Sequence, residues 1–94
     1  MVKTAVADII GKTITGMVFK KGRELTTQPY HQLFLLFSDG TYYELYTANP
    51  PGIMTTGGVD KGGLDEVLAY GEHMLVEYVA VLGPDGKVSV KPPE

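Results

Sequence analysis

The sequence of 94 residues contains no cysteine, only two histidines and no long apolar segment. Without cysteine the chain has neither a disulfide nor a thiolate nucleophile or metal ligand. An oxidising compartment therefore gains no support, and we expect a cytoplasmic protein. Because no apolar run approaches the roughly 18 residues that a membrane-spanning helix needs, the sequence predicts no membrane segment.

Motifs for catalysis and for cofactor binding are also missing. His31 and His73 lack the H-E-x-x-H spacing of zinc proteases, and no third strong ligand is evident. No serine lies in a nucleophile elbow, and no glycine-rich segment has the spacing of a phosphate-binding P-loop. We therefore expect no metal, no cofactor and no catalytic residue, which favours a non-enzymatic protein while leaving a small enzyme open.

The composition indicates one small globular domain over residues 1–94. Hydrophobic residues make up 44% and charged residues 20% of the chain, both near the averages for globular proteins. The net charge is −3, with the basic residues concentrated in the first quarter of the chain. Because the remainder is acidic, the domain-wide basic face of a nucleic-acid-binding protein is absent, and we do not expect nucleic acid as a partner.

The most informative segment is residues 33–47 (LFLLFSDGTYYELYT), which predicts a β-hairpin. Asp39 and Gly40 tolerate the positive φ that a two-residue type I′ loop requires, and aromatic residues dominate the flanks. With this loop, one face of the hairpin, which we assign to the core, carries Phe34, Leu36, Tyr43 and Leu45. A three-residue bulged loop would instead shift one strand by one position and change the division between the faces.

The second face of the predicted hairpin is also largely apolar, and it is the best candidate for an interaction face. Tyrosine is favoured where a surface is apolar but still needs a hydrogen bond, as at protein interfaces. The chain's own helices could cover this face, a second copy could form a two-fold homodimer there, or another protein could bind it. Its residues are Leu33, Leu35, Phe37, Tyr42, Glu44 and Tyr46.

The glycine-rich segment 49–63 offers an alternative function, because a helix is predicted to follow it over residues 63–73. Backbone N–H groups at a helix N-terminus can bind an anion, which would make this a small-ligand or anion-binding protein or a small enzyme. Against this reading, Asp65 and Glu66 in the first turn would repel a phosphate. The candidate loop residues are Gly57, Gly58, Lys61, Gly62 and Gly63.

The remaining segments complete the predicted architecture, in which residues 48–62 form the longest irregular segment. Residues 2–10 fit a short helix or a strand, and Gly16 interrupts a predicted strand over residues 12–20. Residues 75–82 and 87–91 predict two strands joined by a Gly-Pro-Asp-Gly turn, the second at the sheet edge and protected by lysines and prolines. We therefore expect an α+β domain: an antiparallel, strongly bent sheet or small open barrel of about five strands with one or two short helices.

Overall fold

The strands of the sheet form where apolar and β-branched residues recur along the chain. The computed structural model describes residues 5–24, 30–47, 52–55, 58–70 and 74–91. The five longer strands are β1 (Ile14–Gly22), β2 (His31–Phe37), β3 (Thr41–Thr47), β6 (Met74–Leu82) and β7 (Val88–Lys91). The short strands β4 (Ile53–Thr55) and β5 (Asp60–Lys61) both pair with β3.

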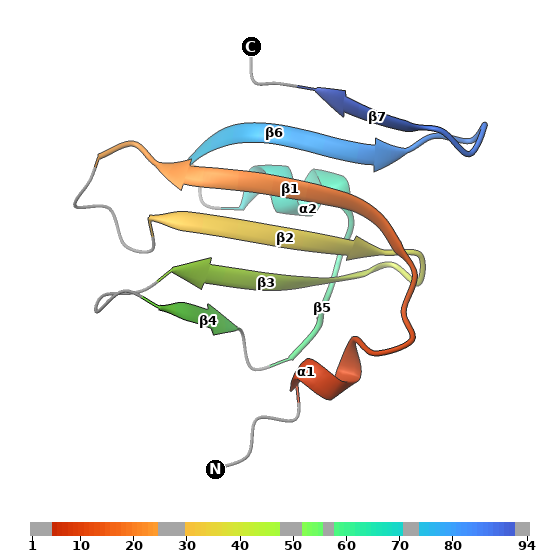
Figure 1. The fold of residues 1–94 in the computed structure, drawn as a ribbon, viewed down its shortest axis with the longest axis horizontal. Coiled ribbons are helices and arrows are strands. Elements are labelled where there is room, and N and C mark those ends of the chain that lie inside the picture. The colour runs from red at the N-terminus through yellow and green to blue at the C-terminus, as the bar shows by residue number, and fades with distance from the viewer. Residues whose placement is uncertain (1–4, 25–29, 48–51, 56–57, 71–73, 92–94) are drawn as a thin grey trace.

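The strands lie in the order β4-β3-β2-β1-β6-β7, with β5 alongside β3, and every pair is antiparallel (Figure 1). The sheet does not close into a barrel, and the molecule is a slab of 41 × 39 × 18 Å. The predicted antiparallel sheet is confirmed, and the fold is mostly β. The position of β7 at the edge, predicted from its lysines and the prolines after it, is also confirmed.

The hairpin of β2 and β3 forms as predicted, but its predicted register is wrong by one residue. Leu35 pairs with Tyr43, which makes the loop three residues long, Ser38 to Gly40. The N–H of Gly40, at φ 81°, donates to the carbonyl of Phe37 at 3.3 Å, as expected of a turn that ends in a left-handed glycine. The Asp39 carboxylate also accepts hydrogen bonds from Thr41 and from the Lys12 ammonium. Lys12 therefore stabilises this loop from outside the hairpin.

In the described part of the chain, two helices accompany the sheet. α1 (Ala5–Asp8) is short and forms where the sequence allowed either a helix or a strand, and α2 (Leu64–Ala69) packs against β1. α2 ends earlier than the helix predicted for residues 63–73, because Tyr70 already has an extended backbone with ψ 128°. Residues 71–73 of that prediction lie outside the described residues.

The predicted irregular segment at residues 48–62 contains β4 and β5, so the prediction of no regular structure there is wrong. The edge of β3 presents backbone N–H and C=O groups that need partners, and these two short strands supply them. Glycine is depleted in strands, which is why the composition of this segment concealed the pairing. Residues 48–51 and 56–57 are not among the described residues.

The main core lies between the sheet and α2. Its buried members are Val18, Phe34, Leu36 and Val67, of which Val18, Phe34 and Val67 are fully buried. Because side chains alternate along a strand, the neighbours of these residues in β1 and β2 point to the opposite face. That opposite face is the one that holds the candidate site.

Candidate functional site

Cross-strand pairing gathers apolar side chains into rows on the face of the sheet opposite α2. Residues directly opposite each other share a face, so the register defines each row. One row crosses five strands and consists of Val90, Ala80, Met17, Leu35 and Tyr43. A second row consists of Tyr78, Phe19, Leu33, Leu45 and Thr55.

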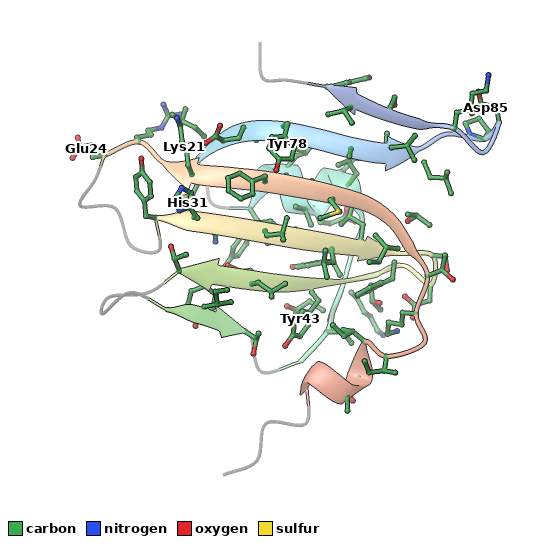
Figure 2. All side chains as sticks on the ribbon, viewed as in Figure 1. Lys21, Glu24, His31, Tyr43, Tyr78 and Asp85 are labelled. Atoms are coloured by element: carbon green, nitrogen blue, oxygen red, sulfur yellow. The ribbon has the colours of Figure 1, made fainter. Side chains whose placement is uncertain are left out.

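These two rows, with Leu82 and Val88 at their margin, form what we call the open face. Figure 2 shows it towards the viewer, with Tyr78 in front of the sheet and α2 behind. One corner is covered by Ile9, which directly follows α1 and packs on Phe37 and Tyr43. Elsewhere Tyr78, Leu82 and Val90 keep 42%, 45% and 62% of their surface exposed. Large apolar residues that are exposed singly need no explanation, whereas a contiguous group of them usually marks a contact surface.

The open face is uneven, with a stacked aromatic pair between two shallow hollows. The rings of Phe19 and Tyr78 stack 5.3 Å apart and 6° from parallel. A shallow hollow on one side of this pair is lined by residues of β1, β6 and β7, including Met17, Ala80 and Val88. Another, on the β2–β4 side, is lined by Phe19, His31, Leu33, Leu45, Tyr46, Thr47 and Ile53.

The open face carries little charge. Among the described residues, its one ion pair joins Lys21 and Glu77 at 3.7 Å near one end of β1, so the two charges compensate each other. His31 lies close by, with its ring centroid 5.6 Å from that of Phe19 (Figure 2). A face of this kind offers neither the basic groups that bind phosphates nor the polar cluster that a reaction centre requires.

A buried polar cluster lies instead beneath α2, on the covered face. Lys20, Gln32 and Glu44 keep only 1%, 4% and 8% of their surface exposed. The Gln32 amide donates to the Glu44 carboxylate at 2.7 Å, whereas the Gln32 carbonyl oxygen has no partner among the described residues. The Lys20 ammonium donates to the carbonyls of Val67 and Tyr70, where unpaired carbonyls end the helix. Lys20 therefore anchors the C-terminal end of α2 to the sheet.

Burial controls the protonation of this cluster. Desolvation raises the pKa of Glu44 above its ordinary value, against the hydrogen bond from Gln32, and the charge of Asp60 raises it further. Desolvation likewise lowers the pKa of Lys20, against the attraction of Glu44. Perturbed groups can mark an active site, but these lie under a helix that Lys20 itself holds in place. The described residues contain no group of side chains able to hold a metal ion.

The six residues predicted to share an interaction face do not share one. Leu33, Leu35 and Phe37 point away from α2, whereas the remaining three, Tyr42, Glu44 and Tyr46, lie on the α2 side. The division is wrong because the one-residue shift in register exchanges the faces of β3. The role of these residues in binding stays a prediction.

The predicted interaction face was drawn from the hairpin alone and did not include the open-face residues of the other strands. These residues alternate with polar or inward-facing neighbours, a signal that was present but could not show which strands would lie side by side. They are Met17, Phe19, Tyr78, Ala80, Leu82, Val88 and Val90.

Two glycines of the proposed anion loop, Gly62 and Gly63, have structural roles. Gly57 lies outside the described residues, Gly58 precedes β5, and Lys61 pairs with Thr41 of β3. The N–H of Gly63 donates to the Glu66 carboxylate at 3.2 Å, so a carboxylate of the protein already takes that donor. Gly62 has φ 148°, and a Cβ there would meet the Tyr42 ring at 3.0 Å. Anion binding by this loop stays a prediction. The N–H of Gly63 is not available for it, because this group already donates to Glu66.

Comparisons with known proteins give neither a family nor a function for this chain. No family model, curated protein or solved structure matches the chain. The helices in the described part of the chain are all too short to span a membrane.

Proposed function

We propose that this protein is a non-enzymatic protein-interaction module whose docking surface is the open face. The observation that carries the proposal is the two apolar rows, which run across the sheet and, apart from the buried Tyr43, stay partly exposed. The inner face of a β-sandwich has the same character, with apolar residues alternating along each strand and a second layer packed about 10 Å away. Among the described residues, Ile9, directly after α1, supplies a small part of such a second layer.

The distribution of polar groups supports the same function. The described ionisable groups with perturbed pKa values on the covered face are held beneath α2 or at its margin, where a substrate would have to displace the helix. The open face, in contrast, offers apolar area and aromatic rings, which contribute most to protein interfaces. Its chemistry therefore suits a protein surface better than a charged small molecule.

Photo-crosslinking in the cells that make the protein tests this function. A photoreactive amino acid at Leu82, which is 45% exposed on the open face, should form covalent adducts with a protein. The matched control places the same amino acid at Leu68, which is 39% exposed on α2. Adducts from Leu82 alone support the proposal, and their mass identifies the partner. Equal yields from both positions, or none from either, would contradict it.

The alternative function, an anion or small-ligand site at residues 49–63, has weaker support because Glu66 takes the N–H of Gly63. A thermal-shift screen with phosphate compounds and common cofactors separates the two functions, since a ligand of the native state raises the melting temperature. A shift that Lys61→Ala removes would favour the loop. Unchanged melting across the screen would leave the open face as the candidate.

A further inference from the structure

We propose that the partner of the open face is the open face of a second copy of this chain, giving a two-fold symmetric β-sandwich. This inference rests on the proposed function, because it names the occupant of the same surface. A two-fold interface uses one surface patch twice, so the patch has to be complementary to itself. Three properties of the open face meet that requirement.

The first property is shape. The stacked pair of Phe19 and Tyr78 lies between the two shallow hollows on the same face. Rotation of a second copy by 180° about an axis parallel to the sheet, midway between the two open faces and between the aromatic pair and one hollow, places the aromatic pair of each copy against that hollow of the other. Both hollows are lined almost entirely by apolar side chains, so such contacts would leave few buried polar groups unpaired.

The second property is charge. The protein carries a net charge of −3, yet on the open face Lys21 and Glu77 neutralise each other. Two identical faces therefore approach without the repulsion that like charges at an interface produce. A strongly basic or acidic partner would find no complementary charge there, which favours a second copy over a charged partner.

The third property is area. A stable interface of standard size buries roughly 800 Å² on each partner, equivalent to a square of roughly 28 Å on a side. With neighbouring strands about 4.8 Å apart, the order β4-β3-β2-β1-β6-β7 makes the face about 24 Å wide, and the nine residues of β1 and β6 make it about 30 Å long, so the face comes close to this size even though Ile9 covers one corner. The slab is only 18 Å thick, and a second copy would convert its exposed apolar rows into the interior of a four-layer molecule.

Light scattering after gel filtration, at two concentrations well apart, tests the inference. We expect the wild-type protein to have twice its chain mass of 10.2 kDa, at least at the higher concentration. Leu82→Glu places a charge on the open face and should restore the mass of one chain. Leu68→Glu adds the same charge at a residue of similar exposure on α2 and should remain dimeric.

Val90→Glu is the second open-face variant, because Val90 is 62% exposed at the sheet edge and we expect its replacement to affect folding less than that of Leu82. Circular dichroism confirms that each variant is folded before its mass is interpreted. If Leu82→Glu unfolds, a folded and monomeric Val90→Glu still supports the inference. If both unfold, the face belongs to the core of the single chain and the inference is overturned.

The outcomes distinguish the inference from the function on which it rests. A wild-type protein that is monomeric at both concentrations overturns the second copy, while crosslinks from Leu82 to a different protein would preserve the interaction function. A dimer that persists in both folded open-face variants uses another surface and contradicts the inference. Adducts of twice the chain mass from Leu82, together with monomeric variants, support both.

Discussion

The two faces of the sheet differ in polarity, and in a way that the usual preference for apolar interiors does not predict. The face covered by α2 buries Lys20, Gln32 and Glu44, whereas the open face leaves apolar rows exposed. Buried charged groups require partners, and here the carbonyls of α2 and the amide of Gln32 supply them. The comparison shows that the chain uses polar contacts to position its own helix, while apolar side chains on the opposite face stay partly exposed.

Because of this difference, we expect substitutions on the two faces to have different effects. Substitutions on the covered face should lower the free energy of unfolding of the single chain. Substitutions on the open face should act mainly on association.

Replacing one phenylalanine on each face compares the faces directly. Phe34→Ala, at a fully buried position, should lower the free energy of unfolding by about 3–5 kcal/mol, because it leaves a cavity beneath α2. Phe19→Ala, on the open face, should cost less than about 2 kcal/mol at concentrations where the protein is monomeric. Urea unfolding of both variants at low concentration measures the difference. Equal losses would mean that the open face is already part of a single-chain core.

Two adjacent lysines of β1 provide the second comparison. Lys20→Met keeps the apolar stem but removes the ammonium that binds the carbonyls of Val67 and Tyr70, and it deprives Glu44 of a nearby cation. We expect a loss of about 3 kcal/mol, as for one partner of a buried polar network.

Lys21→Met is the matched control on the opposite face, where the side chain is 40% exposed. Its effect should stay within about 0.5 kcal/mol. A stable Lys20→Met variant would contradict the anchoring of α2 by Lys20. Hydrogen exchange of α2 amides in both variants would then show whether the helix is held by other contacts.

The loop that sets the division between the faces is tested by Gly40→Ala. Gly40 has φ 81°, and a Cβ there would meet no atom within 4 Å, so the cost is backbone strain alone. We expect a loss of about 1–2 kcal/mol in urea unfolding, with no change in association. Gly52→Ala, a glycine at which a Cβ also has open space, is the control. No loss at Gly40 would indicate that the loop adopts a different turn.

The smallest expected effect is a dependence of stability on pH. Because burial raises the pKa of Glu44, the folded state binds its proton more tightly than the unfolded state. The stability that this proton contributes is fully present below the unfolded-state pKa and is lost as pH rises through the higher folded-state pKa. The hydrogen bond from Gln32 and the charge of Lys20 oppose burial, which limits the effect.

Glu44→Gln should therefore flatten the dependence of the free energy of unfolding on pH between about pH 4 and pH 7. Urea unfolding across this range, with Glu77→Gln as the control for the loss of one carboxylate, measures it. The difference between the two variants isolates the contribution of the covered face. An identical slope in wild type and Glu44→Gln would show that Glu44 does not act as a buried carboxyl group.

Local patterns predicted the five longer strands among the described residues, the turn between β6 and β7, and the edge position of β7, because each depends on residues close together in the chain. The register of the hairpin was not predictable in the same way. A two-residue and a three-residue loop both suit Asp39 and Gly40, and the observed loop includes a contact from Lys12, which is 27 residues away. The strands within residues 48–62 were missed for a related reason, since the edge of β3, rather than their own composition, stabilises them.

The sequence by itself determined that this chain forms an antiparallel sheet with more apolar surface than one short helix can cover. Alternation along single strands is sufficient for that conclusion, because it requires only the period of two. The tertiary structure alone decided which residues share each face. Rows such as Val90, Ala80, Met17 and Leu35 arise from strands far apart in the chain, and a shift of one residue in any pair would send half of a row to the other side.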